Sequence, residues 1–203
     1  YYLAIKLALV LIFLLPVIVG VPMPFAPVQI ILLELFMDLA ASAGFTAEPK
    51  EKNIATRKPR DPTEPVFSPR AIADIVIKAV VLFIAVTGVY LYMLSHTNSL
   101  MEAQTFAFAA WIMGHIVLAY ISRSDRNLVL TTGIFSNRVI TLWALLAVAV
   151  LLVGVYVPSV SSLLKLATVS LSSLLAVFAV VILILLLLEL RKLVLARPSS
   201  NSL

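Results

Sequence analysis

The sixteen residues from Pro27 to Ser42, PVQIILLELFMDLAAS, are nearly all apolar but contain two carboxylates, Glu34 and Asp38. A spacing of four residues places both side chains on one face of a helix, one turn apart. Two carboxylates this close in a low-dielectric setting repel each other, so they share a proton or hold a cation between them. Their oxygens are hard ligands that suit Mg²⁺, Ca²⁺, Mn²⁺ or a proton. We therefore expect Glu34 and Asp38 to bind a metal cation or a proton; the alternative is a polar contact that holds helices together.

Two basic side chains in apolar surroundings are further candidates. Lys6 could pair with Asp38 or Glu34 as a tethered counter-cation, or its ammonium group could extend to the membrane surface. His115, in WIMGHIVLAY, could relay protons or bind an ion, or it could be a packing histidine beside Gly114.

The composition places these residues in a membrane. Of the 203 residues, 62% are hydrophobic and 12% are charged, and the mean hydropathy is +1.10. A soluble domain has about 45–50% apolar and about 25% charged residues, so we expect an integral membrane protein. Crossing a bilayer takes roughly 20 apolar residues as a helix, and six stretches qualify: about 1–20, 26–43, 71–94, 103–122, 139–157 and 169–189. No alternation of period two appears, so the predicted fold is all-α, a bundle of six transmembrane helices.

Basic residues alternate between the gaps of this pattern. They concentrate in 44–70, in 123–138 and after residue 189, whereas Lys165 is the only Lys or Arg in the three other gaps. Basic loops stay in the cytoplasm, so both ends are predicted to be cytoplasmic. We expect 44–70 to be a cytoplasmic loop and 192–203 to be a disordered tail. Asp74 and Lys78, four residues apart at the start of the third span, are interpreted as a local ion pair.

Several classes of function are excluded. The net charge of +5 comes from basic residues in short gaps, without the basic and aromatic face of a nucleic-acid-binding protein. The absence of cysteine rules out disulfides, thiolate zinc sites and thiol catalysis. No GxxxxGK[ST], GxSxG or HExxH motif occurs. No soluble stretch is long enough for a nucleotide-binding domain.

Two loop motifs carry a resemblance to a known family. PVQIILLELFMDLAASAGFTAEP, followed by ATRKPRDPTEPVFSPR, resembles the C-terminal membrane half of P-type cation-transporting ATPases, especially the calcium pumps and related bacterial cation pumps. In that family a helix opened by PVQ carries a central Asp, and a cytoplasmic loop of the form RPPR-x-P-x-EP follows it. SRSDRNLVLTTGIFSNRVI and ELRKLV are similar to later segments of bacterial members. The resemblance covers essentially the whole chain.

The resemblance implies the C-terminal segment of an ATP-driven cation pump. The full pump would use Mg-ATP and form an aspartyl phosphate on a cytoplasmic domain, and the DKTGT motif of that domain is absent from this chain. The chain alone is therefore not expected to hydrolyse ATP. Its implied partners are the lipid bilayer, the transported cation, and the N-terminal part of the same pump with the missing helices and cytoplasmic domains. The implied location is a prokaryotic cell membrane.

The family's ion site carries over only in part. Asp38 matches the cation-binding Asp, and Glu34 falls where calcium pumps have an Asn ligand. Other ligand positions differ, because Met37 replaces a Thr, Leu9 and Gly114 replace Glu residues, and Lys6 replaces an Asn. The Gly and Pro that unwind the helix after the Asp in family members are replaced by LAAS. These departures favour a single cation or a proton, with Glu34 and Asp38 as ligands and Lys6 as a compensating charge.

Two alternatives remain open from the sequence. The chain could be a stand-alone six-helix channel or carrier with acids lining a pore, or a structural membrane subunit. The chain begins at Tyr1 inside an apolar run, which we interpret as a cut or processed end of a longer protein.

Overall fold

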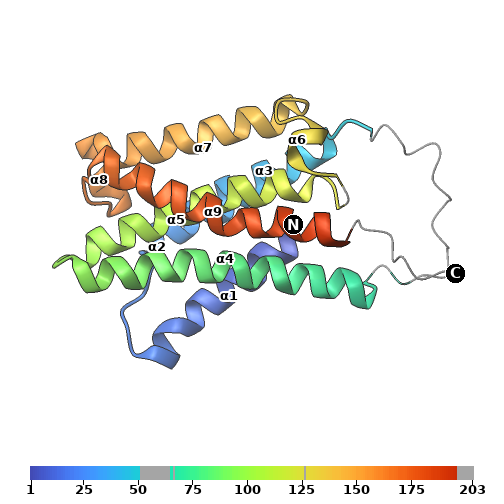
Figure 1. The fold of residues 1–203 in the computed structure, drawn as a ribbon. Helices are drawn as coiled ribbons and strands as arrows, with labels where there is room; N and C mark the ends of the chain where they lie inside the picture. Colours follow the sequence, from blue (N-terminus) through green and yellow to red (C-terminus); the bar gives the residue numbers. More distant parts are fainter. Residues whose placement is uncertain (51–64, 66, 126, 196–203) are drawn as a thin grey trace, which may run out of the picture.

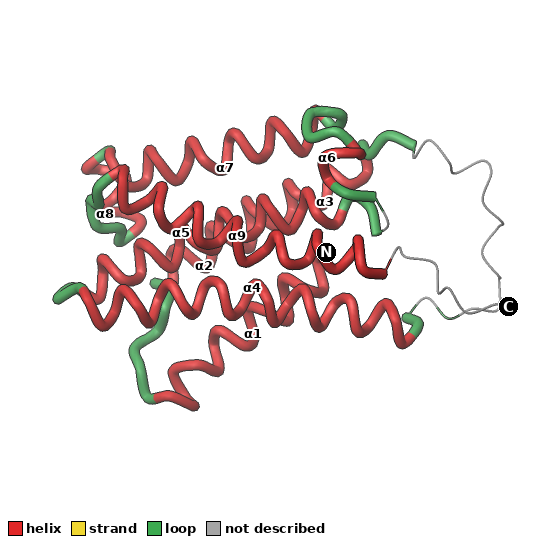
Figure 2. Tube along the Cα trace, viewed as in Figure 1, coloured by secondary structure: helices red, strands yellow, loops and turns green. Residues whose placement is uncertain are grey.

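Six helical spans make up the computed structural model, which describes residues 1–50, 65, 67–125 and 127–195. Most of them run roughly along one axis, and the first, labelled α1 (Tyr2–Val19), is tilted against it (Figure 1). Within these ranges the side chains of Asp38, Leu39, Val194 and Leu195 are not described. No strand occurs in the described part of the chain (Figure 2). All six spans are long and apolar enough to cross a membrane, so the prediction of an all-α membrane bundle is confirmed.

A short loop joins the first two spans, and the first span packs mainly against the third. Helix α1 (Tyr2–Val19) contains Pro16, which removes one backbone donor, and it ends at Gly20, whose φ of 72° is the left-handed conformation that glycine adopts without strain. The loop that follows is held by two side chains from other helices. The Tyr90 hydroxyl donates to the carbonyl of Pro22 at 2.7 Å, and the Gln104 amide donates to that of Met23 at 2.8 Å.

The second span is built from three consecutive elements. These are α2 (Pro27–Leu32), the π-helix η1 (Leu33–Asp38) and α3 (Leu39–Thr46). The span therefore differs from the single regular helix expected over 26–43. A π-helix bonds each N–H to the carbonyl five residues earlier, one more than in an α-helix, and it is common at functional sites.

The third and fourth spans are regular and long. Helix α4 (Pro69–His96) starts with Pro at its first position behind a Ser68 cap, and α5 (Leu100–Ser122) starts behind a Ser99 cap. Both cap hydroxyls accept a bond from a backbone N–H of the first turn, which satisfies donors that the helix leaves unpaired.

The last part of the chain contains two long and two short helices. They are α6 (Val129–Thr132), α7 (Arg138–Tyr156), α8 (Pro158–Leu164) and α9 (Leu171–Leu195). The short helices α6 and α8 lie in gaps where no element was expected. Helix α9 runs beyond the expected end at residue 189, so residues 192–195 of the expected tail are helical; residues 196–203 lie outside the described part.

Helix α5 forms the centre of the bundle. It packs against α4, α7 and α9, and most of its residues are buried. Its buried face is rich in small residues, which allow helix backbones to approach closely in lipid: Ala103, Ala107, Ala109, Ala110, Gly114 and Ala119. The outer faces of α7 and α9 carry exposed leucines, as expected for helices that face lipid.

Candidate functional site

The helix that carries the predicted acids is fixed at its start by Gln29. This side chain is fully buried; its Oε1 accepts the N–H of Ala26 at 3.1 Å, and its Nε2 donates to the carbonyls of Leu164 and Lys165 at 3.1 and 3.2 Å. Because both ends of the amide are used, Gln29 caps α2 and ties it to the C-terminal end of α8. The PVQ motif thus sets the position of the helix from which the acids project.

The same segment is fixed at its far end by Glu48, just beyond α3. Its carboxylate accepts from Nε and Nη2 of Arg123, at 2.8–3.0 Å, and from the Asn137 amide at 2.7 Å. Asn137 also donates to the carbonyl of Gly44 at 2.9 Å, and its Oδ1 caps α7. The Arg123 side chain is only 1% exposed. This group therefore binds the second span to the end of α5 and the start of α7.

Between these two attachments lies the π-helix with Glu34 and Asp38. Leu33 and Met37 point into the core and are nearly fully buried, whereas Leu35 is exposed. Glu34 and Asp38, four residues apart, both lie in this π-helix, whose turn is wider than the α-helical turn that we expected. The buried Met37, at a position where calcium pumps have a Thr ligand by the resemblance, contributes a side chain that packs in the core.

Lys6 and Glu34 form an ion pair that joins α1 to η1. The Lys6 ammonium donates to Oε2 of Glu34, with 27% of the lysine side chain and 38% of the glutamate side chain exposed. The ammonium group also lies 5.0 Å from the centre of the Tyr2 ring. Glu34, one of the two acids considered as partners of Lys6, therefore pairs with it, and the other, Asp38, has a side chain outside the described part.

The Asp38 side chain lies outside the described part of the structure, so its role as an ion ligand stays a prediction. Among the side chains that are described, no group of three His, Cys, Asp or Glu residues is arranged to hold a metal ion.

His115 is fully buried in an aromatic environment on α5. Its ring makes an edge-on contact with Trp111, with 5.0 Å between ring centres, and lies 6.2 Å from the ring of Tyr1. Gly114 beside it faces Leu82 so closely that an added Cβ would lie 2.3 Å from a Leu82 methyl. A glutamate at position 114, as in calcium pumps, would therefore have no room without repacking of α4 against α5.

A second charged group joins α4 to α9 near the ends that hold residues 69 and 195. Asp74 pairs with Lys78 and with Arg191, each at 2.6 Å, so the expected Asp74–Lys78 pair is present and has an additional partner. A cavity of about 30 Å³ lies among these side chains. Nearby, the Lys192 ammonium donates to the carbonyl of Ile121 at 2.6 Å and pairs with Glu189.

The sequence did not predict the ion pairs Glu48–Arg123 and Asp74–Arg191. Arg123 and Arg191 were interpreted only as charges that set membrane topology, and their partners lie 75 and 117 residues away in the chain. Asn137 offered one usable signal, because an Asn just before an apolar helical run is a typical N-cap.

The fold and the site define a multi-pass α-helical membrane protein with an ion pair between its first two spans. Comparison with known families gives the class. Residues 22–194 match the family described as "Cation transporting ATPase, C-terminus". The chain belongs to this family, and the expectation of a C-terminal membrane segment of a P-type cation-transporting ATPase is confirmed; a stand-alone channel or a structural subunit is not favoured.

Three similar proteins are consistent with the family match. The "Probable cation-transporting ATPase F" of Mycobacterium tuberculosis is 27% identical over 68% of this chain and 15% of its own length. The "Calcium-transporting ATPase" of Bacillus subtilis is 26% identical over 78% of this chain and 18% of its own. The "Calcium-transporting ATPase 1" of Yarrowia lipolytica is 24% identical over 91% and 20%. The chain thus spans a fifth or less of the length of these relatives.

Proposed function

We propose that this chain supplies part of the cation or proton site of an ATP-driven P-type cation pump. Glu34 and Asp38 are the ion-binding groups in this proposal, and Lys6 is a built-in compensating charge. The observation that supports it best is the Lys6–Glu34 ion pair, which joins two apolar spans at a π-helix. Intramembrane ionisable residues and π-helices are both concentrated at functional sites.

The balance of charge favours a single small cation. A charged side chain near the bilayer centre costs about 2.5–3.5 kcal/mol, so an unneutralised acid there is unfavourable. Lys6 offsets one of the two carboxylates and leaves one negative charge for the transported ion. A proton or a monovalent cation would neutralise that charge, and one divalent cation would leave a single positive charge. Two Ca²⁺ ions would not be balanced by this set of side chains.

The structural setting favours movement of the ion-binding turn. The second span is held at its start by Gln29 and at its end by Glu48, while the middle departs from α-helical bonding. In alternating access a bound ion is exposed first to one side and then to the other. A segment with fixed ends and a wide central turn can change the position of Glu34 while its neighbours stay packed.

The remaining parts of the pump lie outside this chain. In the proposal, Mg-ATP is used by the cytoplasmic domains of the N-terminal part, and those domains and the missing helices are the partners of this bundle in the bilayer. Both ends of the bundle face the cytoplasm, and the membrane is a prokaryotic cell membrane, in line with the bacterial relatives. Calcium is one candidate ion, because two relatives are named for its transport. His115 is a secondary proton-binding candidate.

The decisive experiment is Asp38→Asn in the full-length protein. We expect this change to abolish ion-stimulated ATP hydrolysis, because it removes the negative charge that Lys6 leaves uncompensated. Hydrolysis and phosphoenzyme formation are measured while Ca²⁺, Mn²⁺, Mg²⁺ and pH are varied one at a time, which also identifies the ion.

The matched control is Glu102→Gln, which removes an acid from the first turn of α5 away from the π-helix and should leave hydrolysis unchanged. Normal ion-stimulated turnover in Asp38→Asn would contradict the proposal. Ion flux through purified protein without ATP would support a channel instead.

A further inference from the structure

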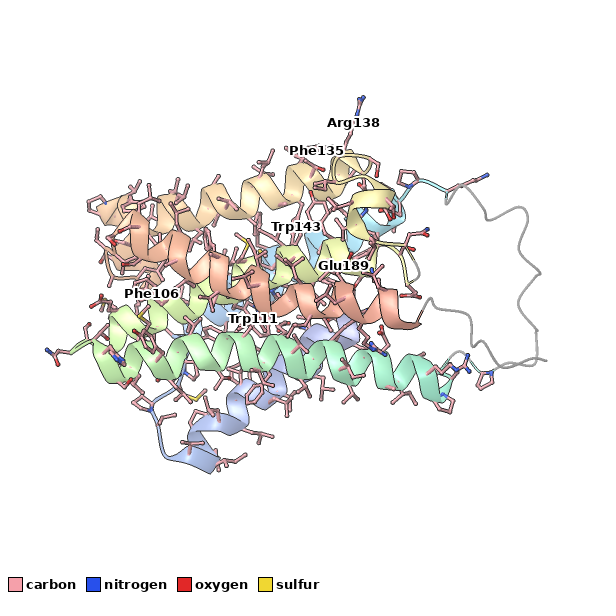
Figure 3. The ribbon with its side chains drawn as sticks, viewed as in Figure 1. Phe106, Trp111, Phe135, Arg138, Trp143 and Glu189 are labelled. Atoms are coloured by element: carbon pink, nitrogen blue, oxygen red, sulfur yellow. The ribbon has the colours of Figure 1, made fainter. Side chains whose placement is uncertain are left out.

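Helix α6 and the turn that joins it to α7, together called the α6–α7 turn below, present three large apolar side chains away from the bundle. Leu130 is 78% exposed, Phe135 is 76% exposed and Ile134 is 39% exposed. They lie at the end of the bundle that also holds Glu48 and Glu189. Figure 3 shows Phe135 beside Arg138 at the side of the bundle, pointing away from its axis.

This exposure is imposed by a well-bonded backbone. Nη1 of Arg123 donates to the carbonyl of Gly133 at 2.8 Å, and the N–H of Val129 donates to Glu189 at 2.9 Å. The Thr132 hydroxyl donates to the carbonyl of Leu128 at 3.0 Å, which closes the turn of α6. Because the loop is fixed by these bonds, its apolar side chains cannot fold back onto the core.

The position of this surface identifies what covers it. It continues directly into the outer face of α7, where Val139, Leu142 and Leu145 are exposed on a membrane-spanning helix. The apolar side chains therefore border an exposed apolar face of a membrane-spanning helix. Phe135 points away from the axis of the bundle, on the side where α7 lies (Figure 3).

Arg138 adds a charge to the same surface. It is exposed, and it forms no ion pair with any residue that the structure describes. As the first residue of α7 it also lies at the positive end of the helix dipole, so the helix itself gains nothing from its charge. Apolar side chains next to an exposed arginine are typical of a segment that lies in the headgroup layer of a membrane.

We propose that the α6–α7 turn is a lipid-binding edge. Phe135, Leu130 and Ile134 insert among the upper acyl chains of the adjacent leaflet, and the guanidinium group of Arg138 pairs with a lipid phosphate. Basic residues near the surface attract anionic lipids, so the edge favours a leaflet that contains them. This inference depends on the membrane fold and not on the ion-binding roles of Glu34 and Asp38.

Site-directed spin labelling tests the insertion. The chain has no cysteine of its own, so a nitroxide can be placed at Phe135→Cys in the full-length protein after replacement of any cysteines elsewhere. Two matched sites give the reference values. Leu145→Cys reports a lipid-facing position on α7, and Asp125→Cys reports a water-exposed position, with 87% of the side chain exposed, near the same end.

In lipid nanodiscs the label at position 135 should be several-fold more accessible to oxygen than to a water-soluble nickel chelate, as at position 145. Accessibility like that at position 125 would overturn the proposal. Shielding from both reagents would also overturn it, because another part of the protein would then cover the turn.

A second comparison tests the role of Arg138. Moving the labelled protein from phosphatidylcholine to a mixture with phosphatidylglycerol should shift the label at position 135 deeper, and Arg138→Gln should remove this shift while leaving the insertion in phosphatidylcholine. An equal shift with and without Arg138 would refute the pairing with phosphate.

Discussion

The second span differs sharply between its two ends and its middle. Each end is held by a buried polar side chain with several partners, Gln29 at the start and the Arg123–Glu48 pair at the finish. The middle is a π-helix whose acid, Glu34, pairs with Lys6 of another span and remains 38% exposed. Both regions use charged or polar side chains in an apolar bundle. The ends fix the helix by these contacts, and the middle is the part at which we propose that the transported ion binds.

The largest effect is expected at the fixed end. Arg123→Met leaves the Glu48 carboxylate without its buried partner and frees the carbonyl of Gly133, so the free energy of unfolding of the membrane domain should fall by about 3–5 kcal/mol. The measurement is the thermal midpoint of the purified full-length protein in detergent. Arg138→Met is the matched control, since that exposed arginine has no ion pair in the described structure and its loss should stay within about 0.5 kcal/mol. Equal midpoints for the two variants would refute a structural role for Arg123.

The second-largest effect is expected at Asp74, which joins α4 to α9 through its ion pairs. Asp74→Asn removes the shared partner of Lys78, whose side chain is 8% exposed, and of Arg191. We expect a loss of about 2 kcal/mol, less than at Arg123 because Asp74 itself is one-third exposed and Asp125 lies 4.0 Å from Lys78. Asp125→Asn, at an 87% exposed carboxylate, should have almost no effect. A larger loss of stability for Asp125→Asn than for Asp74→Asn would contradict this prediction, because Asp125 would then be the carboxylate that stabilises Lys78.

Lys6→Met tests the middle of the span through function. Without the ammonium group, Glu34 is an uncompensated acid until an ion binds, so the concentration of cation, or of protons, that gives half-maximal ATP hydrolysis should fall about tenfold, equivalent to roughly 1.4 kcal/mol. Stability should change less than in Arg123→Met. Lys6→Arg keeps the charge and should behave nearly as the unmodified protein. An unchanged half-maximal concentration in Lys6→Met would contradict this prediction. The Lys6–Glu34 ion pair would then only hold helices together, as the Glu48–Arg123 pair does.

The smallest change in stability is expected at Gly114, where α5 packs closely against α4. Gly114→Ala brings a Cβ to within 2.3 Å of a buried Leu82 methyl, so Leu82 must shift, at a cost of about 1 kcal/mol. Gly88 on α4 has no atom within 4 Å of an added Cβ, and Gly88→Ala should stabilise the helix slightly. The two thermal midpoints should therefore move in opposite directions. A shift of both in the same direction would show that α4 and α5 pack more loosely than described.

The sequence predicted the parts that depend on local composition. Six apolar stretches of sufficient length gave the six spans, because only helices and closed barrels satisfy the backbone in lipid and the sequence lacks the alternation of barrel strands. Lys6 was recognised as a possible partner of the acids, since a lysine in an apolar run needs a compensating charge. The Asp74–Lys78 pair followed from its four-residue spacing.

The parts that depend on distant contacts could not be predicted. Arg123 meets Glu48 across 75 residues, and nothing in either local sequence distinguishes this pair from surface charges. The π-helix was also missed, because LELFMD contains neither the Gly nor the Pro that marks an irregular helix. Its position is set by tertiary packing of Leu33 and Met37 into the core.

The π-helix has a consequence for how this segment is matched to its relatives. A turn bonded five residues apart accommodates one residue more than an α-helical turn between the same two ends. Each residue of an α-helix turns the chain by about 100°, so side chains after Asp38 point in directions different from those in an uninterrupted helix counted from Gln29. Compared with an uninterrupted α-helix, the residues on either side of the turn therefore correspond one to one only within each side, and one extra residue is counted where the two sides meet.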